Sequence, residues 1–149
     1  MRGFLLVQSA ELSLVHVLTE DYLLNGYAVI HHSSVRAWRT IEPEEFTARA
    51  VRLKRLRPKP VPGLDLSDWK SAIASAGERF PLLAIHRETE CPGVCFIGRL
   101  LEVNSRSAAI EELDTQASWT GPARYALRQI TRLGFGGGYE DALARVAAS

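Results

Sequence analysis

The segment Arg57-Pro58-Lys59-Pro60-Val61-Pro62-Gly63 limits the fold of this chain more than any other. Proline lacks a backbone N–H and fixes φ, so prolines at alternate positions allow neither a helix nor a central strand. We therefore expect an extended linker here. A helix follows, because Asp65 and Ser67 can cap a helix that ends near Gly77. Its apolar stripe, which we expect to be buried across both parts of the chain, consists of Leu66, Trp69, Ile73 and Ala76.

On each side of the linker, several predicted strands are followed by a predicted helix. Short runs of β-branched, aromatic or other apolar residues predict strands at 4–7, 12–18, 27–30, 82–85, 95–103, 108–113 and 125–133. Helical spacing predicts helices over 43–56, with Phe46, Ala50, Leu53 and Leu56 on one face, and over 139–147. Asn25-Gly26 fits either a turn or a bulge in a longer strand. The repeated order favours internal duplication over independent elements of similar pattern, with residues 35–38 matching 130–133.

Composition and charge set broad limits on function. The chain has 46% hydrophobic and 23% charged residues and a net charge of +1, which is typical of a globular protein without a global attraction to nucleic acid or anionic membrane. The apolar run at residues 4–7 is too short for a signal peptide or a membrane span. The two cysteines lie four positions apart rather than in a disulfide framework. We expect a cytoplasmic protein that does not bind membranes.

Residues 96–104, Phe96-Ile97-Gly98-Arg99-Leu100-Leu101-Glu102-Val103-Asn104, match the first motif of the Sm-like (LSm) family, and this part of the chain resembles that family. In such a motif the glycine allows a strand to bend sharply. Residues 130–133 would form the closing strand of the second motif. In the N-terminal part, Asp21, Leu24 and Asn25 resemble the end of the first motif, and residues 30–35 stand where the second belongs.

Taken as a whole, including its ending at residues 130–140, the sequence resembles bacterial proteins of unknown function that carry two Sm-like barrels. The resemblance implies a mainly β fold with helices: a first small barrel at 1–56, a linker and bridging helix at 57–79, and a second barrel at 80–149. It also implies RNA contacts at the loop ends of the first barrel, at Asp21, Asn25 and His31. The basic-Gly pair usual in the second motif is replaced by His31-His32 and by Ala126-Leu127.

A basic stretch without any acid lies between residues 46 and 63, and it is the sharpest indication of a nucleic-acid partner. Its cations are Arg49, Arg52, Lys54, Arg55, Arg57 and Lys59. The alternative is a solvated helix face that continues into the linker. We favour this alternative, because no stacking aromatic residues are interleaved with the cations.

The remaining motifs are explained better by a structural role than by catalysis or metal binding. Cys91 and Cys95, with His86 nearby, could supply zinc ligands, but Pro92-Gly93 between them is better explained as a hairpin turn. The glycines at 134–138 match neither the dinucleotide-binding fingerprint nor the P-loop, so they fit a tight turn. His31-His32-Ser33-Ser34 places adjacent side chains on opposite faces, and His16 lies in an apolar run as a structural histidine would.

No catalytic constellation or cofactor motif emerges, so we expect a protein that is not an enzyme and has no cofactor. The preferred hypothesis is a non-catalytic binding or scaffolding protein. It would bind an unknown protein partner, or associate with itself, through loops or exposed barrel edges. The alternatives are RNA or single-stranded DNA binding through residues 49–59, and a small metal-binding protein or enzyme that uses the cysteine hairpin.

Overall fold

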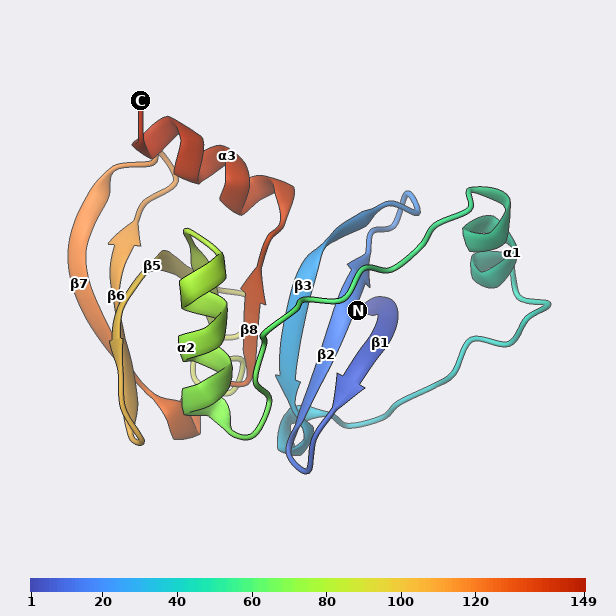
Figure 1. The fold of residues 1–149 in the computed structure, drawn as a ribbon, viewed down its shortest axis with the longest axis horizontal. Helices are drawn as coiled ribbons and strands as arrows, with labels where there is room; N and C mark the ends of the chain where they lie inside the picture. Colours follow the sequence, from blue (N-terminus) through green and yellow to red (C-terminus); the bar gives the residue numbers. More distant parts are fainter.

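The computed structural model describes residues 1–149 and contains one antiparallel sheet of eight strands in the order β1-β2-β3-β8-β4-β5-β6-β7. The strands are β1 (Arg2–Gln8), β2 (Leu12–Leu18), β3 (Leu24–His31), β4 (Leu83–His86), β5 (Cys95–Val103), β6 (Ser107–Leu113), β7 (Trp119–Ala126) and β8 (Arg132–Phe135). The helices are α1 (Phe46–Leu53), α2 (Trp69–Arg79) and α3 (Gly138–Ala147), and short 3₁₀ turns are η1 (His32–Ser34) and η2 (Leu127–Gln129). Figure 1 shows α1 at one end of the molecule, beyond β1 and β2.

The prediction of two Sm-like barrels related by duplication is wrong, although the mainly β composition with helices is confirmed. The edge strands β1 and β7 do not pair with each other, so the sheet is open. Residues 35–38, the expected counterpart of β8 in the N-terminal part, form no strand. Without that strand β1–β3 cannot close on themselves, and β3 instead pairs with β8.

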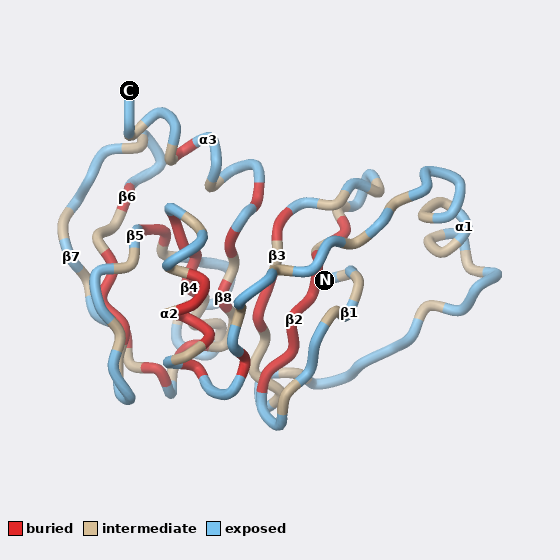
Figure 2. Tube along the Cα trace, viewed as in Figure 1, coloured by how far each residue is buried: buried red, intermediate tan, exposed pale blue.

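The helix α2 packs on one face of the sheet and joins the two parts of the chain, as predicted. Its apolar stripe is buried, and Trp69 is only 8% exposed. Trp69 belongs to a core of 17 buried residues that also contains Leu12 and Leu14 from β2 and Ile110 from β6. Figure 2 shows this burial concentrated in α2 and the sheet, whereas α1 has no buried residue. The helix begins after Asp68, whose carboxylate accepts a hydrogen bond from the Ser71 amide, so the cap is one residue later than Ser67.

A second, smaller core lies beneath α3. Leu143 of this helix packs against Ala84 and Ile97, which point to the face of the sheet opposite the α2 core. Because Leu83 and Ile85 on the same strand belong to the α2 core, β4 is buried on both faces. A central strand covered on both sides is therefore made almost entirely of apolar residues.

Two local predictions need correction, and a third alternative is decided. The strand expected at 125–133 is interrupted by η2, which turns the chain from β7 into β8. The helix expected over 43–56 is shorter, because Glu45 is its extended N-cap and Arg55 has a φ of 55° just beyond its end. Asn25-Gly26 lies inside β3 opposite a register shift in β2, so the bulge and not the turn is correct.

Gly98, the glycine of the Sm-like motif match, lies where a neighbouring backbone comes close, although no barrel is present. A Cβ at this position of β5 would lie 2.2 Å from the Glu111 carbonyl oxygen of β6. At Gly134 in β8, by contrast, the nearest atom to an added Cβ would be the Ala84 methyl group at 3.5 Å. The two strand glycines therefore differ in how much space surrounds them.

We expect Gly98→Ala to destabilise the protein by about 1–3 kcal/mol, because the new methyl group would force the β5 and β6 backbones apart. Gly134→Ala is the matched control and should leave stability unchanged or raise it slightly, because it only restricts the unfolded chain. Urea unfolding of both variants measures the difference. Equal stabilities of the two variants would contradict the close approach.

Candidate binding surface

The helix α1 protrudes from the sheet on two long connections without regular structure, residues 35–45 and 54–68 (Figure 1). Arg2 of β1 holds it by donating a hydrogen bond of 3.1 Å from Nη1 to Thr47 Oγ1. At its other end Lys54 Nζ donates to the carbonyl oxygens of Asp21 and Tyr22, at 2.9 and 3.1 Å. The helix is thus fixed by polar contacts to β1 and the β2–β3 turn rather than by a shared apolar core.

The side of α1 that faces solvent is apolar. Phe46 is 70% exposed and Leu53 is 86% exposed. They are seven residues apart and therefore lie on one helix stripe, with Ala50 between them. Only the edge of Phe46 is covered, by the Tyr22 ring at a centroid distance of 5.7 Å. Of the apolar face predicted over Phe46, Ala50, Leu53 and Leu56, the first and third residues are therefore largely exposed, whereas Ala50 and Leu56 are half-buried.

The cations of the basic stretch divide into two groups. Lys54 binds the β2–β3 turn with its ammonium group. Lys59 is held through its backbone instead, since its amide donates to His16 Nδ1 at 3.1 Å, and its side chain is exposed. The other four, Arg49, Arg52, Arg55 and Arg57, are exposed. Ion pairs of arginine occur at five other positions of the chain, but none of these four forms one. We call Phe46, Arg49, Ala50, Arg52 and Leu53 the α1 surface.

The residues that the Sm-like resemblance implied for RNA contact do not come together. Asp21 lies beside α1, where Thr19 donates to its carboxylate and lowers its pKa. Asn25 accepts a hydrogen bond from the Gly138 amide at the start of α3. His31 lies against Trp69, at a ring distance of 6.2 Å. These three positions serve three different parts of the fold.

The cysteine hairpin is confirmed as the connection between β4 and β5, with Gly93 at a φ of 74°. No group of three or more His, Cys, Asp or Glu side chains is placed to hold a metal ion. Cys91 Sγ lies 3.7 Å from Arg87 Nη2, whereas His86 Nδ1 lies 3.1 Å from Arg132 Nη2. The histidine is therefore next to a cation, which is unfavourable for a metal site.

Histidine and serine pairs in the structure are buried or locally satisfied. Ser13 Oγ and His32 Nε2 are 2.7 Å apart, a contact that the sequence analysis missed, but Ser13 is fully buried and inaccessible to a substrate. His31 Nδ1 is 2.7 Å from Ser33 Oγ in the adjoining 3₁₀ turn. His16 is 6% exposed and stacks on Tyr27, which confirms its structural role.

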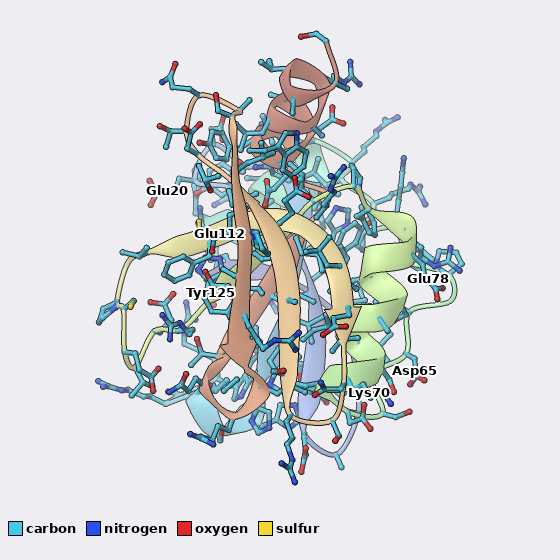
Figure 3. The ribbon with its side chains drawn as sticks, turned by 90° about the vertical axis from the view of Figure 1, so that its left-hand side faces the viewer. Glu20, Asp65, Lys70, Glu78, Glu112 and Tyr125 are labelled. Carbon is cyan, nitrogen blue, oxygen red and sulfur yellow. The ribbon has the colours of Figure 1, made fainter.

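A further polar cluster that the sequence did not reveal lies between β5, β6 and β7. The Arg87 guanidinium lies 5.2 Å from the ring centroids of both Phe96 and Tyr125. Tyr125 donates to the Glu112 carboxylate on the neighbouring strand, and burial together with this hydrogen bond raises the pKa of Tyr125. Figure 3 shows Tyr125 and Glu112 side by side, whereas Asp65, Lys70 and Glu78 lie on the α2 side of the molecule.

Comparison with known protein families, with curated proteins and with solved structures found no match. The resemblance to the Sm-like family therefore stays a prediction. None of the helices is long and apolar enough to cross a membrane.

His86 should make stability depend on pH. Burial, and then the nearby Arg132, lower the pKa of His86 to about 4, against about 6.5 in an unfolded chain. The fold thus favours the neutral ring, so stability is complete above the unfolded pKa and falls as the pH drops from about 6.5 towards 4. We expect the wild type to lose about 1–2 kcal/mol more than His86→Gln between about pH 7 and pH 5, allowing for partial solvent screening. Urea unfolding at both pH values tests this, and equal losses would contradict it.

Proposed function

We propose that this chain is a non-catalytic binding protein that engages a protein partner through the α1 surface. The observation that carries this proposal is the exposure of Phe46 and Leu53 on one stripe of a helix whose position is already fixed. Burying side chains of this size against a partner stabilises a complex by roughly 1.5–3 kcal/mol each. Aromatic residues in such positions commonly supply much of the binding energy.

The free edge of β1 lies at the same end of the molecule as α1 (Figure 1) and supports the proposal. This strand pairs only with β2, and its Leu5 and Val7 are 50% and 49% exposed. An edge strand offers unpaired N–H and C=O groups that another chain can bind. The opposite edge, β7, is less suited to pairing, because it contains Pro122.

We expect the double variant Phe46→Ser/Leu53→Ser to lose partner binding while its melting temperature stays within about 2 °C of the wild type, since exposed residues contribute little to the fold. The control is Leu101→Ser, which changes a leucine that is 49% exposed on β5. Quantitative affinity purification compares the three proteins. Partners retained equally by the wild type and the double variant would contradict a role for α1.

Nucleic-acid binding is the second candidate, and the four exposed arginines on and after α1, together with the exposed Phe46 ring on the same helix, favour it. It is weaker than the first candidate, because Leu53 offers nothing to a phosphate or a base and the net charge is only +1. Sm-like proteins as a family bind single-stranded RNA. This supports RNA binding here only through the resemblance of residues 96–104 and the other motif positions to that family.

Fluorescence anisotropy with single-stranded RNA and DNA tests this candidate. If the four arginines contact phosphates, log affinity should fall linearly with log salt, with a slope of about 0.7 per phosphate neutralised. Arg49→Gln, Arg52→Gln, Arg55→Gln and Arg57→Gln combined should then abolish binding. We expect weak binding or none even for the wild type. Tight, salt-sensitive binding that the quadruple variant loses would overturn the protein-binding proposal.

A further inference from the structure

We infer that the partner of the α1 surface is a protein with an apolar groove rimmed by carboxylates, into which α1 inserts. This inference rests on the proposed function and adds the chemistry of the partner. It follows from three features of α1, namely the spacing of its exposed apolar residues, the unpaired cations beside them, and its protruding position.

The spacing of the apolar residues is that of a helix lying in a groove. Phe46, Ala50 and Leu53 occupy positions i, i+4 and i+7, the anchors by which amphipathic helices bind apolar grooves. Two large side chains separated by two turns, with the small Ala50 between them, form a convex ridge rather than a pocket. The complementary surface must therefore be concave and apolar.

The cations determine the rim of that groove. Arg49 and Arg52 are three residues apart on one flank of the ridge, exposed, and without any ion pair in this chain. Arg55 and Arg57 extend the positive charge beyond the C-terminal end of α1. A partner that covers Phe46 and Leu53 brings its own surface against these arginines. Carboxylates on the rim would pair with them, whereas lysine or arginine there would be repelled.

The position of α1 makes insertion possible. The helix stands away from the rest of the molecule on residues 35–45 and 54–68, so a groove can surround its outer face without colliding with the sheet (Figure 1). The acidic residues nearest in sequence precede the helix. Among them Glu45 is held by Arg39 through a 2.8 Å ion pair and leaves the arginines free.

The experiment places the photo-crosslinker p-benzoylphenylalanine at position 46 of the full chain. The protein is expressed in the cells that naturally contain this protein, and position 101 on β5 is the control site for the crosslinker. Mass spectrometry then identifies the crosslinked residues. The charge requirement is measured by adding Arg49→Gln/Arg52→Gln to the position-46 protein. The matched control is Arg106→Gln/Arg128→Gln, which removes the same charge from two exposed arginines elsewhere.

We expect crosslinks from position 46 to apolar residues of a partner protein with Asp or Glu around them, and a yield that falls about fivefold or more only in Arg49→Gln/Arg52→Gln. Crosslinks to a protein surface without carboxylates, or a yield that is the same in both double variants, would overturn the acidic groove but leave the proposed function standing. Crosslinks to RNA or DNA, to a second copy of this chain, or none above the position-101 control, would overturn both.

Discussion

The pairing of β8 on both of its edges is the interaction on which this fold depends. The four residues of β8, Arg132–Phe135, bond to β3 along one edge and to β4 along the other. They therefore join β1–β3 to the four strands β4–β7. Leu133 and Phe135 are the side chains that β8 contributes to the α2 core, and both are at most 1% exposed. In a closed N-terminal barrel, β3 would have no edge free for β8. Because β3 does pair with β8, the sheet stays open and ends in the free strands β1 and β7.

The sequence allowed most elements to be predicted, since they depend on local patterns. The pattern of apolar residues located β2 and β5 to the residue, and the linker prolines with the expected caps Asp65 and Ser67 placed the start of α2 close to its true cap, Asp68. The assembly of these elements could not be predicted in the same way. Whether residues 35–38 form a strand depends on which edge is free to receive them, and that is decided by β3 pairing with β8, a contact between segments about a hundred residues apart.

The candidate surface was predictable in composition but not in arrangement. The amphipathic pattern of residues 46–53 and the cations from Arg49 to Lys59 are visible in the sequence. Helical periodicity normally indicates a face buried in the same chain, so it could not show that Phe46 and Leu53 face solvent. Nor could charge alone separate Lys54, whose ammonium binds the β2–β3 turn, from the arginines that remain unpaired. The cluster of Arg87, Phe96, Glu112 and Tyr125 had no sequence signal, because its members come from four separate segments.

The way α1 is held explains how so short a helix can serve as a binding element. A helix of eight residues is unstable alone in water, because nucleation costs more than a few hydrogen bonds return. Here Arg2 fixes its first turn to β1 and Lys54 fixes its other end to the β2–β3 turn. The Arg2 guanidinium also lies 4.9 Å from the Tyr22 ring that supports Phe46. These contacts use the inner side of the helix only. The helix is therefore ordered before a partner arrives, so association does not have to supply its ordering entropy. Phe46 and Leu53 remain largely exposed for binding.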